Sequence, residues 1–435
     1  MNVNEIPRIE THAHSHYSNI RLLDCINRPK DMLLRCAELG LKGLALTDHE
    51  SLGGHMEWLQ LEKDLKEKGK LPEDFKAILG NEIYLTKTRD KGQKYFHFIL
   101  IAKDTMGHKA LRELSSTAWY NSYYDRRMER VPTLKSELEE IIQKYKGHLI
   151  GATSCLGSET AQLVLKLAAA EDKSAPIEEI NSIKREIADF LAWGKRLFED
   201  DFYIEVAPSL SKDQITYNTR VKKIATALHI PMIVGCDAHY LKKEDRFIHE
   251  AYLNSKDGER EIASFYEYSH FMDNKEAYSN LIPYFSDEEF EEMCRNSMDI
   301  YDKIGTYDLF HNPIIPEVEV KIYDKFKFDS EYKFIAQLTE SDNVQERYWI
   351  NECLRGLDNL RPWTLWDSNK ETYLKRIDLE ADIILTIGGK LGNCLFQYFN
   401  TFQHFIDLFW ECGSLSGPGR GSSVCYLSNY LLGIT

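Results

Sequence analysis

Short apolar runs alternate with amphipathic segments along the chain up to about residue 270. Runs rich in branched and aromatic side chains, bounded by turn residues, predict strands at 42–48, 75–85, 94–102, 147–155, 201–207 and 231–238. Between them, apolar positions recur with helical spacing, as at 29–40, 108–119, 133–145 and 218–229. Strands that alternate with helices in this way predict a parallel sheet, either open or closed into a barrel.

The pattern changes after about residue 270, where the apolar positions take an almost entirely helical spacing. An extended, proline-containing stretch at 311–330 interrupts the helices and is typical of a linker or an edge strand. We therefore expect three parts, which are a β/α domain over 1–275, a linker with a connecting helix over 276–330, and a mostly helical region over 331–435.

The composition narrows the class of protein. Of 435 residues, 43% are hydrophobic and 28% charged, which suits two or more domains with their own cores. No apolar run reaches membrane-spanning length and no signal peptide is recognisable, so we expect a cytoplasmic protein without a membrane partner. Nine cysteines without a C-x-x-C pair argue against a disulfide framework or a zinc ribbon. The net charge of −15 argues against a generally basic nucleic-acid surface but allows a local basic track.

Side chains of metal-ligand type lie at the ends of most predicted strands. The strand ends of a β/α barrel meet at one rim, so residues far apart in sequence become neighbours there. Imidazoles, carboxylates and a thiolate suit zinc or manganese, and a cluster of such metals would activate a water and clamp a phosphate. The candidate ligands are His12, His14, Asp24, His49, Glu82, His97, Cys155, Asp237 and His239.

Each of these residues has a structural alternative when it is taken alone. A single histidine on an apolar strand, such as His97, is more often a buried core residue, and Cys155 by itself fits a small buried side chain. Asp24 also fits a loop that caps the following helix. The recurrence at successive strand ends favours a metal site. We expect Asp48 and Glu205 to orient ligand imidazoles from behind.

The segments THAHSHYS, LALTDHESLGG, ILGNEIYL, HFILIAKD, GATSCLGSE and GCDAHYLKKED carry a family resemblance. In order and spacing they resemble the motifs of the PHP (polymerase and histidinol phosphatase) domain at the N-terminus of bacterial DNA polymerase III alpha subunits. The later part, from RIDLEADIILTIGG to SGPGRGSSVCYLSNYLLGIT, resembles the start of that polymerase's palm domain. The resemblance implies a distorted, TIM-like β/α barrel followed by a mostly helical partial palm.

The resemblance also implies chemistry. The nine candidate ligands occupy the family's metal positions, for two or three divalent metals, either zinc or manganese with magnesium as a further candidate. No catalytic residue beyond these ligands is expected. The implied activity is a 3′-5′ exonuclease that acts on the primer 3′ end in DNA replication. Arg420, Gly421 and Ser422 match the palm motif that contacts a nucleotide triphosphate, where glycine allows close backbone approach and the following helix offers its N-terminus.

The family's catalytic aspartates would lie beyond the last residue of this sequence. We therefore expect no polymerase activity from the chain alone, and a C-terminal polymerase chain or other replisome subunits as partners. Without such a partner, the apolar residues of 425–435 are expected to be exposed. Two other functions remain open, which are a self-sufficient PHP phosphoesterase acting on small phosphate esters and a non-enzymatic scaffold that binds replication partners.

Overall fold

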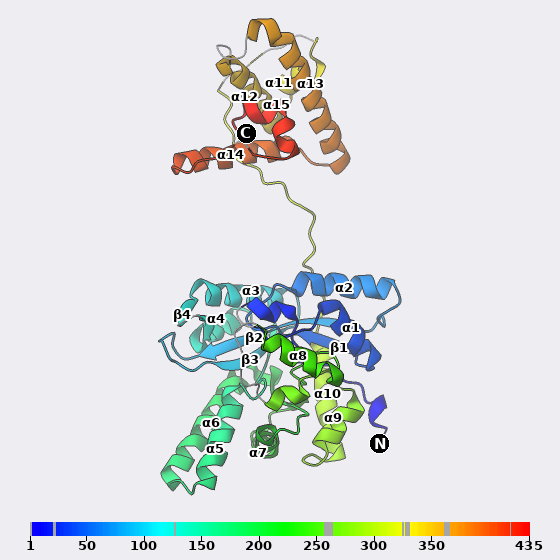
Figure 1. Cartoon of the computed structure of the whole chain (residues 1–435), viewed down its shortest axis with the longest axis vertical. Helices are drawn as coiled ribbons and strands as arrows, with labels where there is room; N and C mark the ends of the chain where they lie inside the picture. Colours follow the sequence, from blue (N-terminus) through cyan, green and yellow to red (C-terminus); the bar gives the residue numbers. More distant parts are fainter. Residues whose placement is uncertain are drawn as a thin grey trace. The chain divides into compact units, whose positions relative to one another are not determined.

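The computed structural model describes residues 2–20, 23–125, 128–255, 264–323, 326, 331–360, 366–417 and 419–435. The chain divides into two compact units, Met1–Leu309 and Phe310–Thr435, each of which is described by itself (Figure 1). The first unit carries the predicted strands and the second is helical.

A curled sheet forms the centre of the first unit. Its strand order is β1-β2-β3-β7-β8-β9, with β6 paired to β2. The residues before the first helix join the two edges of this sheet, because Glu10 pairs with Leu44 in β1 and Ala13 pairs with Ala238 after β9. The predicted distorted β/α barrel is therefore confirmed. The strands are β1 (Gly43–Leu46), β2 (Lys76–Thr86), β3 (Phe96–Ala102), β6 (Pro132–Leu134), β7 (Leu149–Ala152), β8 (Phe202–Val206) and β9 (Met232–Val234).

Strand β3 runs antiparallel to both of its neighbours, β2 and β7, whereas the other pairings of this sheet are parallel. The prediction of an all-parallel sheet is wrong at this strand. The connection between β2 and β3 spans only 87–95, and a short connection joins antiparallel strands because a parallel crossover needs a dozen or more residues. The reversal brings the N-terminal end of β3 to the rim where β2 ends.

Helices cover the outside of the sheet. Helices α1 to α4 flank strands β1, β2, β3 and β6, and α5 and α6 pack against each other as a hairpin (Figure 1). A small separate sheet pairs β4 (Tyr123–Asp125) with β5 (Met128–Arg130). The helices of this unit are α1 (Pro29–Glu38), α2 (His55–Glu67), α3 (Thr105–Tyr120), α4 (Lys135–Lys144), α5 (Glu159–Asp172), α6 (Ile177–Phe198), α7 (Lys212–Leu228), α8 (Arg246–Leu253), α9 (Asn274–Leu281) and α10 (Asp287–Lys303).

The two faces of each strand serve two cores, as the period of two in a strand requires. On β2, Leu79 packs with the helices, whereas Ile78 belongs to an isoleucine-rich cluster on the other face. Ile300 and Ile304 at the end of α10 join that inner cluster. The sequence had suggested a linker with a connecting helix over 276–330, but α10 packs within the first unit, which extends to Leu309.

The second unit is a helical bundle without a strand among its described residues. Its helices are α11 (Lys333–Thr339), α12 (Val344–Leu360), α13 (Trp366–Leu391), α14 (Phe396–Glu411) and α15 (Leu427–Leu431). The core contains Trp349, Ile377 and Phe396. Before it, the described residues of 304–323 form neither helix nor strand. Among the described helices, none combines the length and apolarity needed to cross a lipid bilayer.

The end of the chain packs differently from the expectation for 425–435. Leu431, Leu432 and Ile434 are buried in the core of the second unit. Large apolar side chains are instead exposed along α14, where Phe402 is 44% and Phe409 is 51% exposed. Several large exposed apolar side chains of this unit therefore lie on α14, although Tyr430 of the last stretch is itself 53% exposed.

Candidate metal centre

The structure brings all nine predicted ligands together at one rim of the barrel. They come from segments that the fold collects there. His12 and His14 lie on the segment that joins the sheet edges, Asp24 before α1, His49 after β1, Glu82 in β2, His97 at the start of β3, Cys155 after β7, and Asp237 and His239 after β9.

Glu82 lies at the centre of the group. It shares the inner face of β2 with Ile78, four residues earlier, so the same strand contributes an apolar side chain to the core and a carboxylate to the rim. Its Oε1 lies 3.2 Å from His12 Nε2 and 3.2 Å from His97 Nδ1, and its Oε2 lies 2.6 Å from His49 Nδ1. One carboxylate thus meets three imidazoles from three segments.

Asp237 provides a second carboxylate. Its Oδ1 lies 3.2 Å from both His12 Nε2 and His14 Nε2, and these two ring nitrogens are 3.1 Å apart. The backbone of Asp237 is left-handed, with φ of 48°, which is uncommon for a residue other than glycine. Such strain concentrates at functional sites, because the surrounding structure must hold it in place.

Asp24 provides the third carboxylate. Its Oδ2 lies 2.9 Å from His49 Nε2 and 3.0 Å from His239 Nε2, and its Oδ1 accepts a hydrogen bond of 2.7 Å from the Tyr266 hydroxyl. The N-cap residue of the following helix is Arg28, so Asp24 is not the cap that the sequence left open. Tyr266 carried no sequence pattern that marked it as part of this site.

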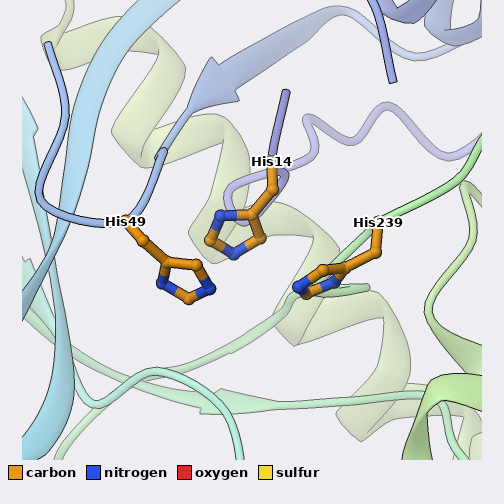
Figure 2. A group of neighbouring side chains, drawn as sticks. All are labelled: His14, His49 and His239. Atoms are coloured by element: carbon orange, nitrogen blue, oxygen red, sulfur yellow. The ribbon is translucent and has the colours of Figure 1, made fainter. Parts of the chain in front are cut away.

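Three imidazoles of the cluster face one another in Figure 2, where His14 lies between His49 and His239. The ring centroids of His14 and His49 are 4.2 Å apart, and those of His14 and His239 are 4.6 Å apart. One nitrogen from each ring lies within 4.8 Å of the other two. Two further groups have the same compactness, namely His12 with His14 and Asp237, and His49 with Glu82 and His97.

Cys155 lies at the edge of the cluster and is half-buried. Its Sγ is 3.7 Å from His97 Nδ1 and 3.9 Å from Glu82 Oε1. Burial, together with the nearby carboxylates, raises the pKa of the Cys155 thiol well above its ordinary value. The neighbouring Ser154 donates a hydrogen bond to Glu82, a contact that no sequence pattern indicated.

Polar partners behind the cluster fix two of the imidazoles. Glu205 Oε1 lies 2.8 Å from His12 Nδ1. The Ser18 hydroxyl donates to Asp48 Oδ1 at 2.7 Å and lies 3.2 Å from His14 Nδ1, so it accepts from that nitrogen. Because Nδ1 of each ring is engaged in this way, Nε2 is the nitrogen that faces the cluster and would bind a metal. Glu205 contacts a ligand imidazole directly, as expected, whereas Asp48 acts through Ser18.

The electrostatics of the cluster suit a cation. Burial opposes charge on Asp24 and Glu82, but the surrounding imidazoles hold the pKa of each carboxyl well below its ordinary value. Burial, followed by the nearness of His49, lowers the pKa of His14 to about 3. Glu82 Oε2 and Asp237 Oδ1 are buried and face imidazole nitrogens at 2.6 and 3.2 Å. Burial lowers the pKa of His49 and His12, but the nearby carboxylates raise it to about 10 for His49 and well above its ordinary value for His12, so a bound metal would replace protons on these rings. Carboxylate oxygens and imidazole nitrogens that converge in this way form a donor set for divalent metals.

Comparisons with known proteins agree with this geometry. Residues 10–209 match the family model described as "PHP domain", so the chain carries a PHP domain. The chain is also homologous to bacterial DNA polymerase III alpha subunits. It is 40% identical to "Probable DNA polymerase YorL" of Bacillus subtilis (strain 168), with 98% of this chain and 34% of that protein covered. It is 26% identical to "DNA polymerase III subunit alpha" of Borreliella burgdorferi, with 96% and 32% covered. The chain thus spans about a third of these relatives.

The proposed nucleotide motif lies in the second unit. Arg420, Gly421 and Ser422 are exposed, and Gly421 has a φ of 81°, which a glycine adopts without strain. The helix that follows differs from the expectation, because its N-terminal amides of Leu427 and Ser428 already donate to the Glu380 carboxylate at 2.8 and 2.9 Å. The role of the three residues in nucleotide binding stays a prediction.

Two of the buried histidines outside the cluster, His55 and His108, lie next to each other in the first unit. His55 Nε2 donates to the Gly80 carbonyl at 2.9 Å, and the ring centroids of His55 and His108 are 5.3 Å apart. Burial, followed by the nearness of His108, lowers the pKa of His55 to about 3. Between this value and the ordinary 6.5, the unfolded chain binds a proton that the folded chain does not bind. His55 therefore makes the fold less stable as the pH falls below about 6.5.

Proposed function

We propose that the PHP domain is a divalent-metal-dependent phosphoesterase that removes nucleotides from the 3′ end of DNA. The observation that carries this proposal is the convergence of three carboxylates, five imidazoles and one thiol on a single rim. This donor set suits two or three metal ions, with zinc or manganese favoured by the imidazoles and the thiol. The homology to DNA polymerases supports DNA as the substrate and replication as the setting.

Different residues would orient the ligand imidazoles of such a centre and supply its negative charge. His12 and His14 present Nε2 because Glu205 and Ser18 accept from their Nδ1 atoms. Glu82, Asp237 and Asp24 supply negative charge between the imidazoles. Bound metals would lower the pKa of a water and stabilise the charge that develops on the phosphate. The ligands have buried partners on several sides, so the centre would be preorganised rather than assembled on substrate binding.

The proposal includes polypeptide partners from the replication machinery. The exposed apolar face of α14, which contains Tyr398, Phe402, Phe405 and Phe409, supports a protein contact because these residues recur on one face of the helix. Arg420, Gly421 and Ser422 are proposed to contact a nucleotide triphosphate by virtue of their match to the palm motif and their exposure. Polymerase activity would need a further set of carboxylates to hold the metals of the polymerase reaction, separate from the cluster in the PHP domain.

The test is an assay on 5′-labelled single-stranded DNA with zinc or manganese, with and without a chelator. A ladder of products shortened from the 3′ end is expected only when metal is present. Asp237→Asn keeps the size of the side chain and tolerates the left-handed backbone, but it removes the charge from the cluster. It should abolish the ladder, whereas His55→Gln serves as a control for a buried change outside the cluster.

Other outcomes of the assay favour other functions. Hydrolysis of small phosphate esters without any shortening of DNA would favour a self-sufficient phosphoesterase on small substrates. Metal binding without hydrolysis of either substrate would favour a scaffold. A full ladder from Asp237→Asn at limiting metal would contradict the proposal, because the activity would then arise elsewhere.

A further inference from the structure

The rim of the barrel carries an aromatic and basic surface beside the metal cluster. We propose that Tyr84, Tyr95 and the exposed lysines of the loop between β2 and β3 bind a single strand of DNA and direct its end to the cluster. This inference rests on the proposed function for the reaction and names the residues that would select a strand over a small ester.

Tyr84 lies directly next to the proposed ligands. It is two residues beyond Glu82 on β2, so both side chains stand on the same face of the strand. It is also paired across the sheet with His97 of β3. The centroid of the Tyr84 ring is 4.9 Å from that of His97 and 5.6 Å from that of His49. The aromatic surface therefore begins at the ligand imidazoles.

Tyr95 extends this surface outward. Its ring centroid is 4.9 Å from that of Tyr84, with an angle of 39° between the planes. Arg130, at the end of β5, lies against Tyr95, with its guanidinium carbon 5.4 Å from the ring centroid and Nη1 donating to the Tyr95 hydroxyl. Tyr84, Tyr95 and Arg130 are all half-buried, so each is held by the fold and still reaches solvent. Tyr84, Tyr95 and Arg130 thus follow one another outward from the cluster. Together they form a stacking platform of the kind that single-strand binders use.

The loop that joins the two tyrosine-bearing strands is basic, although the chain as a whole has a net charge of −15. Lys87, Lys91 and Lys94 are exposed, and Asp90 is the single exposed carboxylate between them. Arg89 is held by Glu137 at 2.7 Å, so the lysines carry the free positive charge. A local excess of positive charge on an acidic chain is expected where a phosphate backbone binds.

The combination fits a strand better than it fits a small ester. A nucleic-acid strand offers bases to stack on tyrosine rings and further phosphates for the lysines, whereas a small ester offers a single phosphate for the metals alone. Stacking is tolerant of base identity, because every base has a π face. The platform therefore predicts binding of single-stranded DNA with little sequence preference and a strong dependence on salt.

Binding is tested apart from hydrolysis. The full chain is titrated, in the presence of a chelator, against a fluorescein-labelled oligothymidylate of about 10 nucleotides, which matches the site size of single-strand binders. Tyr95→Leu should weaken binding about 5- to 150-fold, the range for loss of one base–aromatic stack. Tyr95→Phe keeps the ring and should lose much less affinity. Tyr323→Leu, at an exposed tyrosine of the second unit, is the matched control.

The lysines are tested through the salt dependence. The double variant Lys91→Gln and Lys94→Gln should lower the slope of log K against log salt by about 1.4, because each contact with a single strand contributes about 0.7. The exposed lysines Lys63 and Lys70 give a control variant with the same change of net charge. An RNA strand and a DNA duplex of the same length show whether the surface selects DNA and single strands.

The outcomes separate this inference from the proposed function. If wild type hydrolyses bis(p-nitrophenyl) phosphate with metal, while Tyr95→Leu and the lysine variant bind DNA no more weakly than their controls, the inference is overturned and the phosphoesterase stands. If no substrate is hydrolysed but these variants lose binding as described, the proposed function fails and the inference stands. Equal weakening by Tyr95→Phe and Tyr95→Leu would also overturn stacking, because the hydroxyl would then be responsible.

Discussion

Glu205→Gln tests whether the site is built to hold metal. Glu205 is buried, at 1% exposure, and its Oε1 lies 2.8 Å from His12 Nδ1. Glutamine can still accept this hydrogen bond through its amide oxygen, so the imidazole keeps its orientation. What the variant removes is the negative charge behind the ring, which makes Nε2 a stronger donor to a metal.

The expected loss of metal affinity is about 10- to 100-fold, the usual effect of losing a carboxylate behind a ligand histidine. This corresponds to about 1.4 to 2.7 kcal/mol of binding free energy. Burial by itself lowers the pKa of His12, but Glu205 and the other nearby carboxylates raise it well above its ordinary value. A proton on His12 therefore competes with metal more strongly in wild type than in the variant. The advantage of wild type should grow as the pH rises and this competition fades.

Calorimetric titration of the metal-free chain with Zn²⁺ or Mn²⁺ measures this effect directly. Gly235→Ala provides a second route to the same change, because its Cβ would lie 2.5 Å from the Glu205 carboxylate and would displace it. Glu380→Gln is the matched control, since Glu380 is an equally buried carboxylate in the second unit. Metal affinity in Glu205→Gln that equals wild type at high pH, in a folded protein, would refute the role of Glu205 behind a ligand.

Three further predictions concern other parts of the chain. In Gly157→Ala the new Cβ would lie 2.9 Å from the His97 ring, so the displaced imidazole should lower metal affinity by about 10-fold in the same titration; unchanged affinity would argue against His97 as a ligand. His55→Gln should reduce the loss of unfolding free energy between pH 7 and pH 5 by about 2 kcal/mol, measured with urea and chelator; an equal loss in both proteins would contradict the buried neutral state of His55. Phe402→Ser with Phe409→Ser should reduce self-association in sedimentation if α14 is a docking face, and unchanged behaviour would remove that support.

Much of the fold could be predicted because buried strands of a β/α barrel are nearly continuous apolar runs. The stretches at 75–85 and 201–207 agree with β2 and β8 within a residue. The strands β4, β5 and β6 were missed, since each has three residues and no apolar alternation. The direction of β3 was missed because side-chain alternation is the same in parallel and antiparallel strands; the short connection after β2 carried the missing information.

The sequence predicted which side chains lie together at the rim, but it did not predict their geometry. Residue types at strand ends, together with the PHP motifs, identified the nine side chains that the structure brings together. Asp24 is on a loop, and its position depends on contacts that no local pattern reveals, such as the hydrogen bond of 2.7 Å from its backbone amide to the Asn19 side chain. The same holds for Tyr84, which looked like an ordinary strand residue until its distance from His97 was known.

The backbone around the cluster explains why this geometry could not be predicted from the sequence. Glu50, Ser154 and Asp237 all have left-handed backbones, although each is a residue for which this conformation costs about 1 to 2 kcal/mol. All three lie just after a strand at the rim of the barrel. Each makes a polar contact that offsets this conformational free energy. Glu50 accepts from the Tyr84 amide at 2.6 Å, Ser154 donates to Glu82, and Asp237 faces the histidines. The ligand cluster and the strained backbone therefore depend on each other, and this interdependence emerges only when the strands are assembled.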